Sequence, residues 1–422
     1  MLTDPERHAL DCLDAAALHR SLLELLAVPS ITGSAAESEL LHGLAGQAER
    51  LGLEVDLWQP DLAELRADPD FPGTEAERSE IWGLVAVSEE RDGPTVILQG
   101  HVDVVPPGDP AAWPGNPFTP RISGDVLYGR GTCDMKAGVA ANLAALAAIR
   151  ASGVALAGRI ALHLVASEED GGLGAFATLR RGHRGDACLI PEPTALNLIT
   201  ANCGALTFEL SVPGSAAHGS IRTAGVSAIE KFLPLFAGLR ALEAERNASR
   251  DPLLAGYEIA APLSIGQVSS GDWPSTVPDL LVAQGRYGVL LDENPAAARA
   301  AFEQRVAEVC EADPWLRSHP ASVRWSGGQF ASGRLPAGDP LRAVVAGADA
   351  DVVGGAVVER GVPYGSDLRL YAGAGIPTLH YGPGEPADAH TSHERVSLTE
   401  TVQAARTLIV AALRLTGSSA TP

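Results

Sequence analysis

Short apolar runs that end beside a histidine or a carboxylate constrain the fold of this chain more than any other feature. Thr95–Leu98 leads to His101, and Arg159–Ala166 leads to a pair of glutamates. Asp186–Ile190 leads to a glutamate between two prolines, and an alanine-rich helical stretch, Ala137–Ala151, separates the first two runs. Strands that alternate with helices in this way predict an α/β fold with a mostly parallel sheet covered by helices. The carboxyl ends of such strands share one edge, where ligands bind.

Side chains of the kinds that bind divalent metal ions follow these runs or tight glycine turns. They are His101, Asp134, Glu169, Glu192 and His390. Nitrogen and oxygen ligands that meet at one edge suit zinc or a similar ion. Alone, each residue has a plainer explanation: Asp134 could cap the helix that follows it, and His393 competes with His390. As a set they predict a metallo-enzyme with two metal ions.

Two further acidic residues complete the predicted chemistry. Glu168 and Glu169 are adjacent at a strand end, so their side chains point in different directions. One can bind metal while the other faces the substrate, where a carboxylate beside activated water is a suitable general base. Asp103 lies two residues after His101, on the same face of an extended segment. Asp103 could hold the imidazole in place or orient the substrate.

The length and the strand order predict two domains. A chain of 422 residues is too long for one compact core. Between residues 205 and 332 the pattern changes to a β-α-β-β-α-β order, which is typical of a ferredoxin-like α+β domain. The sequence therefore predicts a catalytic domain of residues 1–204 and 333–422 with an inserted domain at 205–332. Two strands and a long polar loop are also expected, at Val352–Val353, Thr378–His380 and Asp56–Glu80.

Composition narrows the possible partners and the cellular location. The net charge of −21 disfavours nucleic acid and anionic membranes as partners. No apolar run is long enough to span a bilayer, and the polar start lacks the apolar core of a signal peptide. Five scattered cysteines form no CxxC pair, which favours free thiols in a reducing compartment. A cytoplasmic protein that binds neither nucleic acid nor membranes is expected.

The motifs, in their order and spacing, resemble the M20 family of metallopeptidases across nearly the whole chain. They are GHVDVVP, GRGTCDMKAG, ASEEDGG, PEPT, GSAAHGS and AHTSHE. Members of that family include acetylornithine deacetylase, succinyl-diaminopimelate desuccinylase, aminoacylase and glutamate carboxypeptidase. The resemblance implies two zinc ions, with Co²⁺ or Mn²⁺ as alternatives. It implies that Asp134 bridges the ions, that His101 and Glu192 complete one site, and that Glu169 and His390 complete the other.

The same resemblance implies roles for residues outside the ligand set. Glu168 would be the general base, Asp103 would support His101, and a cis peptide would join Asp134 to Met135. The inserted domain would be a lid and dimerisation domain, whose His218 steadies the oxyanion in the partner subunit's active site. Three residues would contact the substrate: Arg286, Ser275 and Ser366. Arg286 could equally form a structural ion pair, and relatives often carry asparagine at the position of Ser275.

The expected activity is hydrolysis of the amide bond of a small N-acyl amino acid or N-acyl amine, as in acetylornithine deacetylase. A metallo-dipeptidase or carboxypeptidase with the same machinery is the near alternative. A non-catalytic binding protein on this fold is a remote alternative, because all the chemical positions are intact. A two-metal phosphoesterase would be expected to carry more cationic residues near the ligands than these loops hold.

Overall fold

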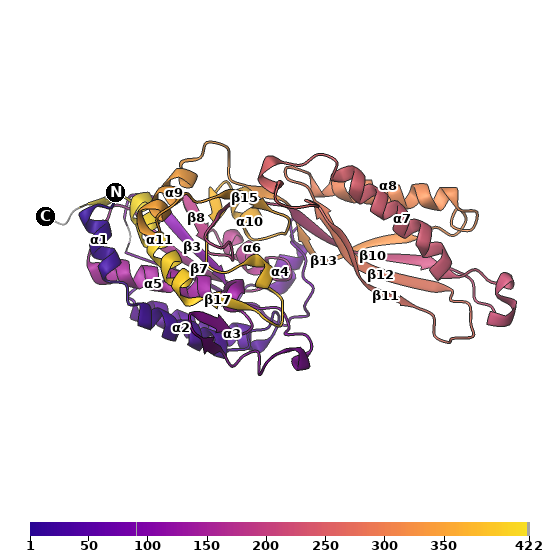
Figure 1. Cartoon of the computed structure of the whole chain (residues 1–422), viewed down its shortest axis with the longest axis horizontal. Coiled ribbons are helices and arrows are strands. Elements are labelled where there is room, and N and C mark those ends of the chain that lie inside the picture. Colours follow the sequence, from indigo (N-terminus) through magenta and orange to yellow (C-terminus); the bar gives the residue numbers. More distant parts are fainter. Residues whose placement is uncertain (90, 420–422) are drawn as a thin grey trace.

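The chain forms two lobes in this computed structural model, which describes residues 1–89 and 91–419 (Figure 1). The larger lobe contains a nine-stranded sheet in the order β1-β2-β7-β3-β8-β16-β9-β14, with β15 paired to β9. Its strands are β1 (Glu54–Trp58), β2 (Gly83–Val87), β3 (Thr95–His101), β7 (Arg159–Val165), β8 (Ala187–Ile190), β9 (Leu198–Asn202), β14 (Gly333–Arg334), β15 (Glu359–Val362) and β16 (Thr378–His380). The central strands β7, β3, β8 and β16 are parallel, which confirms the predicted fold class.

Helices cover both faces of this sheet. They are α1 (Asp4–Asp11), α2 (Ala15–Ala27), α3 (Ala35–Arg50), α4 (Leu62–Ala67), α5 (Ala137–Ser152), α6 (Leu173–Arg180), α9 (Pro340–Val352), α10 (Leu368–Gly373) and α11 (Leu398–Thr416). Helices α5 and α11 pack on β3 from one side, where small alanine side chains let the helices approach closely. Helices α6 and α10 cover the other side through Ala175, Leu179, Leu368 and Tyr371.

Two small sheets complete the larger lobe. Strands β4 (Arg121–Ser123), β5 (Val126–Tyr128) and β17 (Arg395–Ser397) form the first. Strands β6 (Ala155–Leu156) and β18 (Ser418–Ser419) form the second. The first sheet brings the segment before α11 beside the turn that leads into α5, because β17 pairs with β5.

The smaller lobe lies to the right in Figure 1 and has a sheet and a hydrophobic core of its own. It comprises β10 (Gly204–Pro213), α7 (Ala228–Arg246), β11 (Leu263–Ser270), β12 (Leu280–Val289), α8 (Pro295–Ala312) and β13 (Ser322–Phe330). The sheet order is β11-β12-β10-β13, with every pair antiparallel, which is the predicted ferredoxin-like arrangement. In this core the ring of Phe302 packs against Phe208 in a tilted arrangement and against Tyr287 edge to face.

Two local predictions are wrong. Val352 is the last residue of α9 and Val353 follows it, so the expected strand at Val352–Val353 does not exist. Leu341, Val345 and Ala348 are buried at helical spacing. This periodicity indicates a helix more strongly than two adjacent valines indicate a strand. The segment Asp56–Glu80 is not one long loop, because it contains part of β1 and all of α4.

Two further features concern membrane-spanning helices and the state of the cysteines. Within residues 1–89 and 91–419, no helix is long and apolar enough to cross a membrane. All five cysteines are free thiols, as predicted.

His163 on β7 makes the stability of the larger lobe depend on pH. It is buried and its Nδ1 lies 3.0 Å from the Tyr371 hydroxyl. Burial lowers the pKa of His163 to about 3, with a further contribution from nearby His183. The folded protein therefore keeps this imidazole neutral at pH values where the unfolded chain binds a proton. Stability is lost as pH falls below about 6.5.

We predict that His163→Gln reduces this acid sensitivity. The free energy of unfolding of the wild type should fall relative to the variant by up to about 1.4 kcal/mol for each pH unit below 6.5. Urea unfolding at several pH values between 7.5 and 5.0 measures the difference. His8 is exposed and provides the matched control, since His8→Gln should leave the slope unchanged. Parallel curves for the wild type and His163→Gln would contradict the assignment.

Candidate active site

The carboxyl end of β3 delivers His101 into the interior. Its Nδ1 lies 2.9 Å from the main-chain oxygen of Asp103. A carbonyl oxygen only accepts, so Nδ1 donates and Nε2 faces the carboxylates. Nε2 lies 3.0 Å from Asp134 Oδ1 and 3.8 Å from Glu192 Oε1. Burial opposes the charged form, but Glu192 and Asp134 outweigh it and raise the pKa of His101. So close an approach of His101 to the carboxylates of Asp134 and Glu192 requires a positive charge between them, from a proton or a metal ion.

Asp134 sits on the turn Thr132–Lys136 that leads into α5. The peptide bond between Asp134 and Met135 is cis, as the family resemblance predicts. Main-chain N–H groups of Cys133 and Asp134 donate to Glu394 Oε1, at 3.0 and 3.2 Å. These contacts hold the turn so that the two oxygens of Asp134 face two different histidines.

His390 and Glu169 form the second half of the cluster. His390 Nε2 lies 3.0 Å from Glu169 Oε2 and 3.3 Å from Asp134 Oδ2. Burial lowers the pKa of His390, but the hydrogen bonds with Asp134 and Glu169 outweigh it and raise that pKa to about 11. Within the described residues, the other oxygen of Glu169 is buried without a hydrogen-bond partner. A buried carboxylate oxygen left open in this way is suited to a cation.

The electrostatics of the cluster also favour a cation. Burial raises the pKa of Glu168, Glu169 and Glu192, and the charges of neighbouring carboxylates raise it further. Burial acts in the same direction on Asp134, but hydrogen bonds from His101 and His390 hold the pKa of Asp134 below its usual value. So much buried negative charge is costly unless positive charge lies among it.

The distances between donor atoms fit metal ligation. Ligands about 2 Å from a zinc ion lie roughly 3.3 Å apart around a tetrahedron. The four histidine–carboxylate distances in the cluster run from 3.0 to 3.8 Å. Donor atoms of His101, Asp134 and Glu169 all lie within 4.8 Å of one another. The structure therefore brings all five predicted ligands together.

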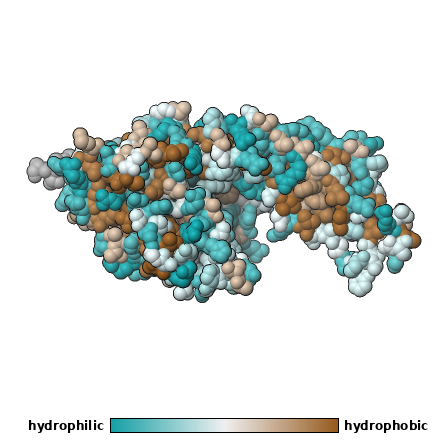
Figure 2. Space-filling model, in the orientation of Figure 1, coloured by the Kyte–Doolittle hydropathy of each residue, from teal (hydrophilic) through white to brown (hydrophobic). Residues whose placement is uncertain are grey.

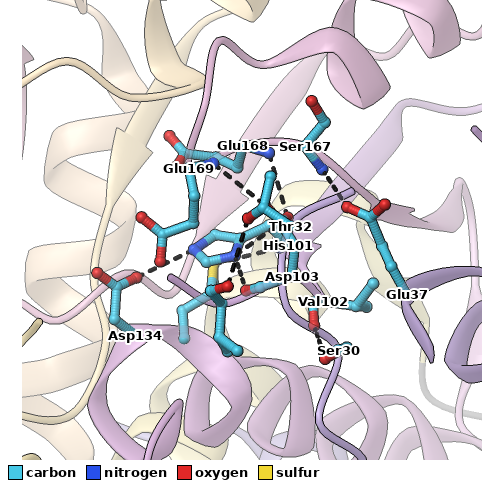
Figure 3. A network of polar contacts seen from close by, with 12 residues as sticks. Ser30, Thr32, Glu37, His101, Val102, Asp103, Asp134, Ser167, Glu168 and Glu169 are labelled. Atoms are coloured by element: carbon cyan, nitrogen blue, oxygen red, sulfur yellow. Dashed lines mark hydrogen bonds and ion pairs between the residues drawn. The ribbon is translucent and has the colours of Figure 1, made fainter. Parts of the chain in front are cut away.

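Asp103 organises the turn that carries Glu168 and Glu169 (Figure 3). Its Oδ1 accepts from the main-chain N–H of Glu168 at 3.1 Å, and its Oδ2 accepts from that of Glu169 at 3.2 Å. Thr32 adds a hydroxyl donor at 2.8 Å. The main-chain oxygen of Asp103 accepts a hydrogen bond from His101, and the carboxylate of Asp103 binds mainly the main chain of Glu168 and Glu169. The family resemblance implies the support of His101 but not the binding of this turn.

A buried charge network beneath the same turn was not predicted from the sequence. Ser167 adopts φ +62°, a region that non-glycine residues rarely occupy. Its main-chain N–H donates to Glu37 at 2.9 Å, and its hydroxyl donates to Asp170. Arg78 pairs with Glu37 at 3.0 Å and with Asp170 at 3.5 Å. No sequence pattern points to Arg78, because its partners come from distant segments.

A cavity of about 220 Å³ opens beside the cluster, and Ser366 lines it together with Glu168 and Tyr364. It adjoins a cleft of about 550 Å³ between the lobes, which Arg286 lines from β12. The molecular surface is hollowed where the two lobes meet (Figure 2). Ser366 is buried, and its hydroxyl lies 3.1 Å from His380 Nε2. Ser366 and Arg286 therefore lie where a substrate could contact them.

His218 and Ser275 lie outside this cleft in their own chain. Both are exposed, and the main-chain N–H of Gly219 donates to the oxygen of Ser275 at 2.6 Å. His218 follows the far end of β10, about 20 Å along the strand from Thr207, which lines the cleft. Ser275 lies beside it, in the connection from β11 to β12. Their roles stay predictions. His393 lines a different pocket, with Trp113 and Arg121, so the structure favours His390 as the ligand.

Residues 97–414 match peptidase family M20/M25/M40. The chain belongs to this family. It is therefore a metal-dependent hydrolase that acts on amide bonds, which confirms the predicted enzyme class.

Curated relatives match most of the chain. N-formyl-4-amino-5-aminomethyl-2-methylpyrimidine deformylase of Halalkalibacterium halodurans is 27% identical over 384 residues, 86% of this chain and 85% of its own. Succinyl-diaminopimelate desuccinylase of Stenotrophomonas maltophilia is 28% identical over 390 residues, 89% of this chain and 93% of its own.

The fold is also similar to solved structures. That of the dipeptidase Dug1p from Saccharomyces cerevisiae covers 98% of this chain and 99% of its own, with a TM-score of 0.77 and 15% identity. This likeness concerns the fold alone.

We predict that His390→Ala lowers the amount of zinc that the enzyme retains after dialysis, while His393→Ala does not. Of these two histidines, His390 lies 3.0 Å from Glu169 and 3.3 Å from Asp134, whereas His393 lines a different pocket. Roughly one ion per subunit should be lost from the first variant. Metal analysis by mass spectrometry measures the stoichiometry. Equal zinc loss in both variants, or loss only in His393→Ala, would contradict this ligand assignment.

Proposed function

We propose that this protein is a di-zinc hydrolase that cleaves the amide bond of a small N-acyl amino acid or N-acyl amine. The observation that carries the proposal is the sharing of Asp134. One of its oxygens faces His101, near Glu192, and the other faces His390, near Glu169. This is the donor arrangement expected when a single carboxylate lies between two cations.

The substrate class rests on the relatives and on the charges around the cleft. The deformylase and the desuccinylase are named for removal of a small acyl group, and both match over more than four fifths of their length. Among the described residues that line the cleft between the lobes, Arg286 supplies the one guanidinium. A phosphoester site would require more cationic groups around the transferred phosphate. An amide with one carboxylate suits the cleft better.

In the proposed arrangement His101, Asp134 and Glu192 would hold one ion, and Asp134, Glu169 and His390 would hold the other. Two zinc ions in these positions would polarise the amide carbonyl and lower the pKa of water to near 7. Co²⁺ or Mn²⁺ would serve the same purpose, since the donor atoms are nitrogen and oxygen.

Glu168 is the proposed general base. It lines the cavity beside the cluster without taking part in the close histidine contacts, so its carboxylate remains available to the substrate. It would accept a proton from the attacking water and deliver it to the departing amine. Asp103 fixes the main chain at Glu168, because its carboxylate accepts hydrogen bonds from the N–H groups of Glu168 and Glu169. Arg286 would bind the carboxylate of the substrate, and the Ser366 hydroxyl would contact the acyl amine within the cavity.

The test is hydrolysis of a panel of N-acetyl, N-formyl and N-succinyl amines and dipeptides by the zinc-loaded enzyme and by Glu168→Gln. The wild type should cleave the acyl amines faster than the dipeptides. Glu168→Gln should lose about 10²–10⁴ in kcat, because a positioned base is missing, while keeping its zinc. A wild type that cleaves only dipeptides would favour the dipeptidase alternative. A fully active Glu168→Gln would contradict the mechanism.

We further propose that two copies of the chain pair through the smaller lobe. On α7 the exposed side chains of Ile229, Leu233 and Phe236 lie at helical spacing and form an apolar stripe. Apolar residues gather on the surface of this lobe (Figure 2). Strand β11 is an edge of its sheet, with main-chain groups available for pairing. A second copy would cover both features and could bring His218 into the other active site.

Mixing two inactive variants tests this shared site. His218→Ala should lose about 10²–10³ in kcat if His218 steadies the oxyanion. When it is mixed with Glu168→Gln and the subunits are allowed to exchange, each hybrid dimer contains one intact site. Activity should return to about a quarter of the wild-type value, as expected for random pairing. Absence of recovery after verified exchange would rule out a contribution of His218 from the partner.

A further inference from the structure

Two opposite charges in the cleft between the lobes lack ionic partners. Arg286 on β12 donates one hydrogen bond, to the main-chain oxygen of Pro363 at 2.9 Å. Within residues 1–89 and 91–419, no carboxylate lies within 4.0 Å of its guanidinium. Glu75 lines the same cleft from the larger lobe, and in that part of the chain no Lys, Arg or His lies within 4.0 Å of it. Two charges of opposite sign thus face one cleft without pairing to each other.

The carboxylate of Glu75 is held in place by both lobes. Its Oε1 accepts from the Thr207 hydroxyl of β10 at 2.8 Å. Its main-chain N–H donates to Asp170 at 3.2 Å, which ties the residue to the turn that carries Glu168. The side chain passes over Gly327, where a Cβ atom would lie 2.8 Å from Glu75 Cγ. Gly327 also has φ +64°, so glycine suits this position for two reasons.

One oxygen of Glu75 remains open to the cleft. The bond from Thr207 occupies Oε1, and the described residues supply no hydrogen-bond donor to Oε2. Glu168 and Glu169 line the same cleft, whereas Glu75 is absent from the lining of the smaller cavity beside the metal cluster. Thr207, which donates to Glu75, is the direct cross-strand partner of Arg286, and the neutral side chains of Gln267 and Gln284 line the same cleft. A positioned carboxylate with an unused oxygen is a suitable partner for an ammonium or guanidinium group.

We propose that Glu75 is a specificity-determining residue that binds a cationic group of the substrate. This inference rests on the proposed deacylase function and names its substrate class more closely. The preferred substrate carries a carboxylate that pairs with Arg286 and a second, cationic end that pairs with Glu75. Thr207 and Gly327 fix the carboxylate so that it meets that cationic end.

The simpler role for Glu75 is a neutral tether between the lobes through Thr207. Glu75→Gln separates the two roles, because glutamine keeps an oxygen that can accept from Thr207 and loses only the charge. Thr207→Val is the matched control, because it removes the tether and leaves the charge. If Glu75 is only a tether, Thr207→Val has the larger effect and neither variant distinguishes cationic from neutral substrates.

The experiment compares a cationic substrate with a neutral one of nearly the same shape, Nα-acetyl-L-lysine and Nα-acetyl-L-norleucine. The same two residues are also offered as glycyl dipeptides, so that one series is cleaved whether the enzyme is a deacylase or a dipeptidase. We expect Glu75→Gln to lower kcat/KM for the lysine substrate by 10- to 100-fold, mainly through KM. For the norleucine substrate it should change kcat/KM by less than about 2-fold, within the range of a neutral surface change.

Charge reversal provides a second, independent measurement. Glu75→Lys should turn the preference toward Nα-acetyl-L-glutamate over Nα-acetyl-L-lysine. An unchanged lysine-to-norleucine ratio in Glu75→Gln, or an equal loss on both substrates, would overturn the inference. Cleavage of the glycyl series alone would overturn the proposed function instead, while the lysine-to-norleucine ratio in that series would still decide the role of Glu75.

Discussion

The concentration of buried negative charge at the carboxyl edge of the large sheet is the constraint on which the rest of the site depends. Asp134, Glu168, Glu169 and Glu192 converge there around the imidazoles of His101 and His390. Burial alone would push these carboxyls toward their neutral forms. A pair of divalent cations would reverse that tendency, because it would keep the ligands ionised and leave Glu168 free to exchange a proton. The proposed metal binding and the proposed chemistry of Glu168 would therefore both follow from the same concentration of buried carboxylates.

Rigid backbone around the cluster makes this crowding possible. Asp103 binds two successive N–H groups of the glutamate turn, and Glu394 binds two successive N–H groups of the Asp134 turn. In each case a buried carboxylate orients a turn of the main chain, and that turn places another carboxylate in the cluster: Glu169 in the first case and Asp134 in the second. Arg78 adds the positive charge that this supporting layer requires, through its pairs with Glu37 and Asp170. Removing one partner of such a buried pair typically costs about 3–5 kcal/mol.

Much of this could be predicted from the sequence, for a physical reason. Residues at strand ends follow local patterns, so the apolar runs that precede His101 and Glu169 predict where both residues lie. The ferredoxin-like order of strands and helices can be read from the sequence, because apolar residues repeat about every two positions in strands and about every 3.6 positions in helices. Arg78 and Glu37 were not predicted, because their pairing depends on how distant segments pack and leaves no local trace. The strand predicted at Val352–Val353 is wrong for the converse reason: two adjacent β-branched residues give a local strand signal, but the buried face of α9 decides the structure.

The segment after α4 connects the two lobes to the catalytic turn, and this explains why charges in the cleft could affect the chemistry. Asp170 accepts from the N–H groups of Glu75 and Ala76, at 3.2 and 2.9 Å, while Thr207 of the smaller lobe donates to Glu75. The main-chain N–H of Gln329, on β13, donates to the oxygen of Pro72 at 2.8 Å. A rotation of the smaller lobe must move or break these bonds. A substrate held by Arg286 on that lobe and by Glu75 on this segment would therefore favour one relative placement of the lobes. The same bonds would then hold the turn that carries Glu168 in a fixed position relative to the substrate. Binding of the substrate by Arg286 and Glu75 would in this way help to position its amide bond beside Glu168.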